Sequence, residues 1–525
     1  MLTPNGRQPW ILSTLTGTLL VLIFPRVDYG FLAWFALIPL FFLIHEQPLA
    51  KVTQFGFWTG VVFYFFGLLW VTNTIINYGN VPVVLSYLIL ALLAAYLGLY
   101  FALFCYLLKK FSRGNPLSFL WLAPVLWTAL EYLRSTHATY GFSWLGLGYS
   151  QAGNLPVIQM AELTGIYGIS TLIVFINASL FFMLHAWLMK GKNSPTEDFN
   201  CKPALRVLGF ALVVLALWLG YGNNALEKWR ESSKKTASFR VALAQGNIPQ
   251  NLKWNPLFQD KVTNTYRELS LKAVPQKPDL IVWPEAAIPF YFTRDKINSL
   301  FVRNIARATK TPLLFGGPHL KIKNKARTSY NSAFVIDQDG QTLGRYDKIH
   351  LVPFGEFVPF QDILWFVNKM VEGIGNFGRG EKTGVFEVKD TRLGISICYE
   401  IIFPDLVRQS VQQGAQFLVN ITNDAWFGKS AAAYQHMDMV ALRAVENRVP
   451  IVRAANTGIT GAIDPTGYIR QATELFTTEL VITDIYPNQT GKTFYTQHGD
   501  VFSQICLLLT VLFALRFYLL KKQKT

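Results

Sequence analysis

The stretch LGISICYE (393–400) places a cysteine, Cys398, near the end of a short apolar run. Short runs of Leu and Ile of this length are typical of strands that are buried on both faces. Comparable runs recur over the second half of the chain, and longer amphipathic segments lie between them. The segments predicted as strands are 239–248, 279–285, 312–317, 330–337, 343–353, 393–400, 417–424 and 451–464.

The segments between these runs have the periodicity of helices. We expect helices at about 256–273, 295–309, 404–414 and 431–448. Alternating strands and helices predict an α/β domain in which helices cover the faces of sheets.

The rest of the chain has a different composition. The whole protein of 525 residues is 51% hydrophobic and only 15% charged, with a mean hydropathy of +0.27. A soluble protein of this length would carry about a quarter charged residues. Long apolar runs fill residues 1–222, and another covers 501–520. The composition therefore predicts a polytopic α-helical membrane bundle in addition to the α/β domain.

A membrane-spanning helix needs about 20 mostly apolar residues. About eight segments approach this length: 9–25, 29–45, 53–72, 82–108, 115–133, 156–189, 204–221 and 501–520. The predicted organisation is seven spans within 1–222, a linker at 223–238, the α/β domain at 239–500, and an eighth span with a tail at 501–525.

The distribution of Lys and Arg predicts the orientation of these spans. With alternating loops, one side receives most of the basic residues: Arg7, Lys51, Lys109, Lys110, Arg113, Lys190, Lys192, Lys202, Arg206, Lys521, Lys522 and Lys524. The short loops of the other side receive only Arg26 and Arg134. By the positive-inside rule, both termini are cytoplasmic and the α/β domain lies in the periplasm. The net charge of +16 thus reflects topology rather than nucleic-acid binding.

Three polar residues stand at or near predicted strand ends, where α/β proteins place reactive groups. Glu285 ends DLIVWPE, Lys348 lies in GRYDKIH, and Cys398 precedes Glu400 by two residues, which puts both on one face of a regular strand. A thiol becomes a nucleophile when a base takes its proton and a cation stabilises the charge that forms. We therefore expect Cys398 as nucleophile, Glu285 as general base and Lys348 as the stabilising cation.

Each residue taken alone has a more ordinary explanation. A free cysteine in a strand is usually a small core residue, a glutamate after proline often caps a turn, and a lone lysine is usually solvated. His350 and His436 could suggest a Cys–His pair, but His436 lies in a predicted helix and a papain-like arrangement is disfavoured.

Three separated motifs occur in an order that resembles the nitrilase superfamily. They are WPE (283–285), GRYDKIHLVPFGE (344–356) and CYE (398–400). The resemblance covers about 240–485 and implies a nitrilase-like αββα sandwich. It also implies that Glu285, Lys348 and Cys398 form the Glu–Lys–Cys triad of that superfamily.

With the membrane half included, the chain resembles the apolipoprotein N-acyltransferase family. The stretches GFSWLGLGYSQ (141–151), QGNIPQNLKW (245–254) and NDAWFG (423–428) carry this likeness, with Ser143 where the family more often has proline. It implies the last step of bacterial lipoprotein maturation in the inner membrane. A membrane phospholipid would donate an acyl chain to the N-terminal amine of a diacylglyceryl-cysteine apolipoprotein, through a thioester on Cys398 and without metal or cofactor.

The family likeness also implies supporting residues: Glu356, Tyr399, Glu400, Asn331 and Trp254. Glu356 would orient the lysine or the donor, and Tyr399 and Glu400 would flank the nucleophile. Alternatives stay open for two of them, because Trp254 could be a packing aromatic and Asn331 a turn residue.

The segment FVPFQDILWFVNKMVEGIGNFG (357–378) is unusually apolar for a loop of a polar domain. It could lie at the membrane interface as a glycine-hinged lid, or form a core helix of the domain. This segment and the many spans favour acyl transfer over a membrane-anchored nitrilase-type amidase or hydrolase, for which one span would suffice. A transporter is a third alternative, but its path would need more charged residues within the spans.

Overall fold

The computed structural model describes residues 6–136, 141–190, 202–253, 255–323, 326–357 and 377–522. The chain divides into two compact units. The first, here called the helical unit, comprises 1–69, 84–227 and 498–525. The second, here called the α/β unit, comprises 70–83 and 228–497.

The helical unit is built from long apolar helices joined by short turns. Its helices are α1 (Arg7–Leu22), α2 (Ile38–Glu46), α3 (Leu49–Gly67), α5 (Val83–Ser112), α6 (Phe119–Thr136), α7 (Leu155–Ile158), α8 (Ala161–Thr164), α9 (Ile166–Lys190), α10 (Lys202–Lys235, of which the last turns belong to the α/β unit) and α17 (Val501–Lys522). Short 3-10 turns add η1 (Gly30–Trp34), η2 (Pro116–Ser118) and η4 (Leu147–Gln151).

Five helical segments among the described residues are long and apolar enough to cross a membrane: Val83–Ser112, Pro116–Thr136, Ile166–Met189, Lys202–Lys235 and Val501–Leu520. A sixth is possible if α3 and α4 (Trp70–Gly79), which meet at a bend of 56°, form one broken span. The predicted first span corresponds to α1, which has only 16 residues, and the second to the short helices η1 and α2. The number of eight spans therefore stays a prediction, whereas the polytopic helical character is confirmed.

The α/β unit holds two six-stranded sheets, in the orders β12-β1-β2-β3-β4-β5 and β11-β10-β9-β8-β7-β6. The strands of the first sheet are β1 (Phe239–Gln245), β2 (Leu280–Val282), β3 (Leu313–Lys323), β4 (Ala326–Ile336), β5 (Thr342–Asp347) and β12 (Glu479–Ile485). Those of the second are β6 (Val385–Val388), β7 (Thr391–Ile397), β8 (Phe417–Thr422), β9 (Ile451–Ala455), β10 (Gly461–Ile463) and β11 (Ile469–Ala472).

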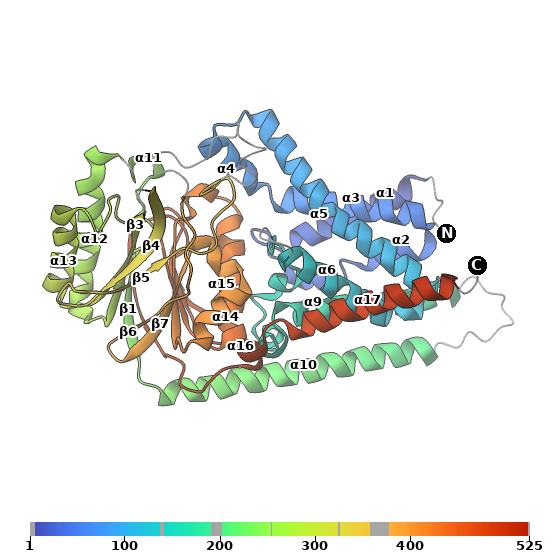
Figure 1. Cartoon of the computed structure of the whole chain (residues 1–525). Helices are drawn as coiled ribbons and strands as arrows, with labels where there is room; N and C mark the ends of the chain where they lie inside the picture. The colour runs from blue at the N-terminus through green and yellow to red at the C-terminus, as the bar shows by residue number, and fades with distance from the viewer. Residues whose placement is uncertain are drawn as a thin grey trace. The chain divides into compact units, whose positions relative to one another are not determined.

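The inner faces of the two sheets form the central core. Val241 and Leu243 of the first sheet and Ile395 and Val419 of the second belong to one buried apolar cluster. Figure 1 shows α12 (Gln259–Ala273) and α13 (Lys296–Thr309) outside the first sheet, and α14 (Pro404–Gln412) and α15 (Ala432–Asn447) outside the second. The predicted αββα sandwich is thus confirmed.

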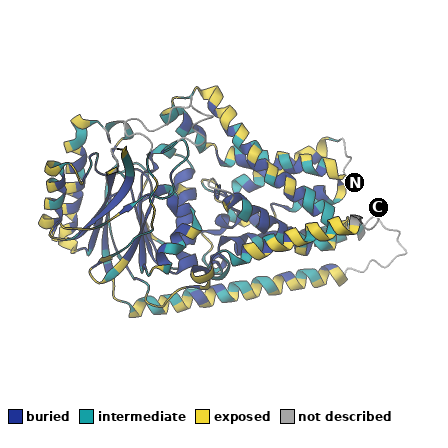
Figure 2. Cartoon of the chain, viewed as in Figure 1, coloured by how far each residue is buried: buried dark blue, intermediate teal, exposed yellow. Residues whose placement is uncertain are grey.

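The helices of the unit begin where local chemistry permits. The Asp295 carboxylate accepts a hydrogen bond from the backbone N–H of Asn298 at 3.0 Å and caps α13, and Pro404 starts α14. The remaining short elements are α11 (Gln250–Lys253), α16 (Phe494–His498), η5 (Pro256–Phe258), η6 (Val274–Gln276), η7 (Cys398–Ile402) and η8 (Asp424–Phe427). In Figure 2, α12 and α13 show exposed outer faces, whereas α15 is buried along most of its length.

Several predicted strands end earlier than expected. The run 393–400 is a strand only to Ile397, because Cys398 has a φ of +53° and cannot continue an extended chain. The run 343–353 ends as a strand at Asp347, and the single strand predicted at 451–464 is the antiparallel hairpin of β9 and β10. The predicted linker 223–238 is helical as far as Lys235, because α10 continues through it.

Candidate active site

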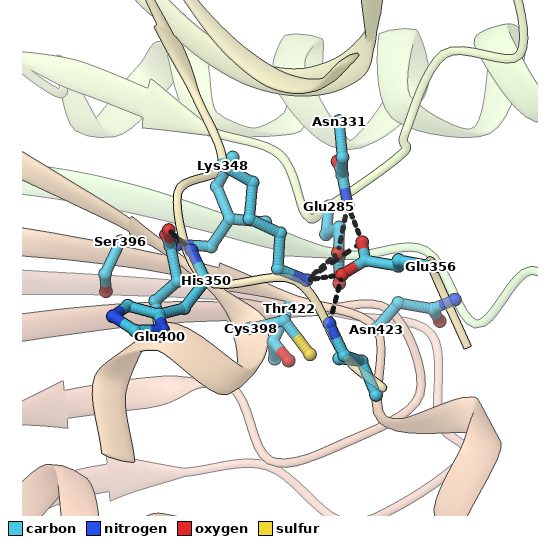
Figure 3. Close-up of polar contacts among 12 residues, drawn as sticks. Glu285, Asn331, Lys348, His350, Glu356, Ser396, Cys398, Glu400, Thr422 and Asn423 are labelled. Atoms are coloured by element: carbon cyan, nitrogen blue, oxygen red, sulfur yellow. Dashed lines mark hydrogen bonds and ion pairs between the residues drawn. The ribbon is translucent and has the colours of Figure 1, made fainter. Parts of the chain in front are cut away.

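Lys348 lies directly after β5, and its ammonium is buried between two carboxylates. Its side chain is 1% exposed, and Nζ lies 3.3 Å from Oε1 of Glu285 and 3.0 Å from Oε2 of Glu356. The backbone on both sides is held, since the Lys348 N–H donates to the Asn331 carbonyl and the Gly380 N–H donates to the Lys348 carbonyl. Figure 3 shows the ammonium and both carboxylates in one cluster.

Two opposing effects act on this ammonium. Burial lowers the pKa of Lys348, but the charges of Glu285 and Glu356 outweigh burial and hold the pKa well above its ordinary value. Lys348 therefore stays charged and cannot serve as a proton acceptor at neutral pH.

Asn331, in β4, joins the two carboxylates. Its Nδ2 donates to Oε1 of Glu285 and to Oε1 of Glu356, both at 2.7 Å. The backbone N–H of Val352 donates to Oε2 of Glu356 at 2.9 Å. Each oxygen of Glu356 is therefore occupied, which suits a residue that positions others rather than one that moves a proton.

Glu285 has a different environment. It follows β2 by three residues and is 6% exposed. Its Oε1 accepts from Lys348 and Asn331, while Oε2 is buried without a hydrogen-bond partner in the described part of the chain. A buried carboxylate oxygen without a donor is costly, and such atoms are typical of functional sites. This oxygen is available to receive a proton.

Cys398 begins the turn η7 at the end of β7. Its backbone has a left-handed conformation, which is strained for a residue other than glycine, and the residue is 7% exposed. Burial and the charge of Glu285 raise the pKa of the Cys398 thiol to about 12, while Lys348 acts in the opposite direction. The resting cysteine is thus a thiol. Figure 3 shows it beside Lys348 and Glu285.

Glu400 does not share a strand face with Cys398, as a regular strand would require. Instead its carboxylate ties η7 to the loop after β5. Oε2 accepts from the backbone N–H of Ile397 at 2.7 Å, and Oε1 accepts from the N–H groups of Ile349 and His350 and from the Tyr346 hydroxyl. Burial raises the pKa of Glu400 to about 7, although these donors oppose the rise. The residue links the segments that carry Lys348 and Cys398.

A second buried polar network surrounds the end of β8. Asp424 contacts Arg453 at 2.6 Å and His436 at 3.4 Å, and the Thr422 hydroxyl donates to it at 2.9 Å. Burial raises the pKa of Asp424, but Arg453 and His436 outweigh burial and hold it below its ordinary value. His436 is therefore engaged by an acid and a guanidinium.

Two aromatic contacts account for the other residues near the nucleophile. The His350 ring stacks on Phe403 with centroids 4.3 Å apart, and Tyr399 meets the same phenylalanine edge-on at 5.1 Å. Burial and the neighbouring Cys398 raise the pKa of the Tyr399 phenol. His350 thus packs on Phe403, which directly follows η7.

Comparison with known proteins adds to this geometry. A family model described as the apolipoprotein N-acyltransferase N-terminal domain matches residues 16–179, and one described as carbon-nitrogen hydrolase matches 240–495. A protein of Geobacter metallireducens named apolipoprotein N-acyltransferase is 42% identical over 503 residues, which cover 95% of this chain and 94% of the relative. The chain belongs to the apolipoprotein N-acyltransferase family.

More distant members of this family also match along nearly the whole chain. A relative with the same name from Pasteurella multocida is 32% identical, with 94% of this chain and 92% of the relative covered. One from Haemophilus ducreyi is 31% identical, with 95% of both covered. The resemblance inferred from the motifs is therefore confirmed at the level of the family.

The structure brings most of the predicted site residues together. Glu285, Lys348, Glu356 and Asn331 form one bonded cluster, and Cys398 and Glu400 lie against it. Tyr399 adjoins the nucleophile and packs on Phe403. Trp254 and residues 358–376, which include most of the predicted apolar lid, lie outside the described residues.

Sequence reasoning missed two groups near the site. Lys253 is fully buried and contacts the backbone of Glu285, and it lies inside the quoted stretch QGNIPQNLKW. The pair of Asp424 and Arg453 comes from two segments whose contact no spacing in the sequence predicts. Lys253 and Asp424 each lie inside a family-like stretch, which was the available signal for both.

Proposed function

We propose that this protein transfers an acyl chain from a membrane phospholipid to the N-terminal amine of a diacylglyceryl-cysteine apolipoprotein. The observation that carries the proposal is Oε2 of Glu285, which has no hydrogen-bond partner among the described residues and lies in a buried cluster with Lys348 and beside the Cys398 thiol. Membership of the apolipoprotein N-acyltransferase family supports the same reaction.

In the first half-reaction, Oε2 of Glu285 takes the S–H proton as Cys398 Sγ attacks the ester carbonyl carbon. The Lys348 ammonium stabilises the oxyanion that develops. The C–O bond then breaks, Glu285 returns the proton to the departing oxygen, and lysophospholipid leaves. The acyl chain remains as a thioester on Cys398.

In the second half-reaction, the free α-amine of the apolipoprotein attacks the thioester. Glu285 accepts a proton from the amine, the C–S bond breaks and an amide forms. The proton then passes to the released thiolate, and the thiol is restored. Glu356 and Asn331 touch no reacting atom in this scheme and position Lys348 and Glu285.

The α/β unit would carry out this chemistry on the periplasmic side of the inner membrane, with both termini in the cytoplasm. The excess of Lys and Arg in the alternate loops supports this orientation. It gives the site access to lipoproteins after their export.

A labelled phospholipid tests the proposal. Purified protein incubated with it should form a hydroxylamine-sensitive acyl adduct, and a diacylated lipopeptide should then discharge the adduct as amide. Cys398→Ala should form neither product. If this variant still acylates the lipopeptide, the proposal is wrong. If the adduct releases only fatty acid in the presence of lipopeptide, the protein is a hydrolase instead.

A further inference from the structure

Lys253 is a second buried lysine of the catalytic cluster, and the reaction scheme leaves it without a role. It is the last residue of α11 and has no exposed surface. Its Nζ donates a hydrogen bond to the backbone carbonyl of Glu285 at 3.0 Å. A lysine is rarely buried completely unless a partner compensates its charge.

The carbonyl that Lys253 holds belongs to the backbone turn after β2, which backbone hydrogen bonds to β3 also support. β2 ends at Val282, and Ala286 has a φ of +49°. The neighbouring carbonyl of Pro284 accepts from the Gly316 N–H at 3.1 Å. The hydrogen bond from Lys253 therefore restrains the backbone of Glu285 further, and the side chain of Glu285 must point toward Cys398.

The charges of the cluster balance only when Lys253 is counted. Glu285 and Glu356 carry two negative charges, and Lys348 supplies one positive charge. Lys253 supplies the second. Of the other acids nearby, Asp424 is paired with Arg453, and Glu400 is held by three backbone N–H groups and a hydroxyl. An uncompensated buried charge is strongly unfavourable.

The electrostatic environment of Lys253 agrees with this count. Burial lowers its pKa to about 8, while the charge of Glu285, and that of Cys398 once it is ionised, act to raise it. The ammonium thus interacts with both the acid and the nucleophile, and it is the charged form that predominates at neutral pH.

We propose that Lys253 is a positioning residue for Glu285, which anchors the backbone of that residue and supplies the positive charge that keeps its carboxylate ionised in the resting enzyme. The proposal rests on the proposed role of Glu285 as general base. Without the second cation, Glu285 would hold a proton at higher pH and could not accept one from Cys398.

Two variants separate the effect of the hydrogen bond to the Glu285 backbone from the effect of the positive charge. Lys253→Gln keeps a donor but removes the charge, and Lys253→Met removes both. The rate of acyl-adduct formation on Cys398 is measured from pH 5 to 9 with a labelled phospholipid. In both variants the acidic limb of the profile should move up by about one unit or more, the shift expected for loss of a nearby charge. Lys253→Met should also have a plateau rate about fivefold below that of Lys253→Gln, because a hydrogen bond from a neutral donor contributes about 1 kcal/mol.

Lys261→Met, on the exposed face of α12, is the matched control and should reproduce the wild-type profile. If the acidic limb of Lys253→Gln coincides with that of the wild type, the role of the charge is refuted, whatever happens to the plateau. Equal plateau rates for Lys253→Gln and Lys253→Met would refute the role of the hydrogen bond to the Glu285 backbone. If the wild type itself forms no adduct, the proposed function has failed instead.

Discussion

Cys398 combines an unusual backbone conformation with a thiol that is protonated at rest. The left-handed φ of +53° costs free energy in a residue other than glycine, and the surrounding contacts of Glu400 hold the turn in place. Because the pKa of the thiol is raised, nucleophilicity must come from proton transfer during the attack and not from a stored thiolate. The unpartnered oxygen of Glu285 is the group positioned for that transfer.

The first prediction concerns the pH dependence of this thiol. Alkylation of Cys398 by iodoacetamide needs the thiolate, and the pKa of the thiol is raised to about 12. The rate should therefore rise about tenfold per pH unit from pH 7 to 10 without reaching a plateau. Mass spectrometry of the peptide that contains Cys398 gives the rate at each pH. A plateau near pH 7 would mean that a stable thiolate faces Lys348, contrary to this view.

Asn331 offers a second prediction, because it donates to two carboxylates at once. Asn331→Asp keeps the shape but places a third carboxylate 2.7 Å from both acceptors. We expect acyl-adduct formation to fall at least about 100-fold, since like charges raise the proton affinity of Glu285 and displace it. Single-turnover assays with labelled phospholipid measure this rate.

Asn304→Asp, at an exposed position of α13, makes the same chemical change away from the site and should leave the rate unchanged. An active Asn331→Asp enzyme would show that the bridge between Glu285 and Glu356 is dispensable.

Among the secondary-structure elements, α4 is a helix that the sequence patterns did not predict as a separate element. It follows α3 after a bend of 56°, yet it belongs to the α/β unit. The hydroxyls of Thr74 and Tyr78 donate to the carbonyls of Trp426 and Ala425 in η8, each at 2.9 Å. The turn η8 begins at Asp424, so α4 helps to hold the segment that carries the buried Asp424–Arg453 pair.

These contacts lead to a third prediction. Tyr78→Phe removes one hydrogen bond to η8 but keeps the ring, which lies 4.6 Å from that of Trp426. Loss of a bond worth about 1 kcal/mol should lower the acyl-transfer rate about fivefold and leave the thermal midpoint nearly unchanged. Tyr87→Phe, at an exposed position of α5, is the control. Equal rates in both variants would mean that η8 holds its conformation without α4.

For the whole molecule, the predicted property to test is the orientation of the chain in the membrane. Five segments among the described residues are fit to cross a membrane, and with the eight predicted spans the basic residues collect in alternate loops. A bilayer imposes this arrangement, since each crossing reverses the side of the chain and positive residues are retained inside. The side of the α/β unit then follows from the number of crossings before it.

Single cysteines test this orientation in a variant whose own four cysteines are replaced. Lys310→Cys lies in the α/β unit and Arg113→Cys follows α5, and both positions are exposed. In intact cells with a permeable outer membrane, an impermeant maleimide should label the first and reach the second only after the inner membrane is disrupted. The reverse pattern would contradict the periplasmic assignment.

The fold class, the membrane half and the family can all be predicted from the amino-acid sequence. These properties depend on hydrophobic periodicity, on composition and on short motifs, all of which are local in the chain. Glu285, Lys348 and Cys398 could be selected as candidates because each stands in such a motif near a strand end.

The interactions among those residues become visible in the folded chain and not in the sequence. The sequence predicted Cys398 as part of a regular strand, whereas in the structure it begins the turn η7. The Glu400 carboxylate stabilises this turn through hydrogen bonds to backbone N–H groups. The compensating lysine at 253 and the attachment of η8 by α4 join residues far apart in the chain. Burial, charge balance and hydrogen bonding depend on distances in space, and residue spacing along a sequence does not contain them.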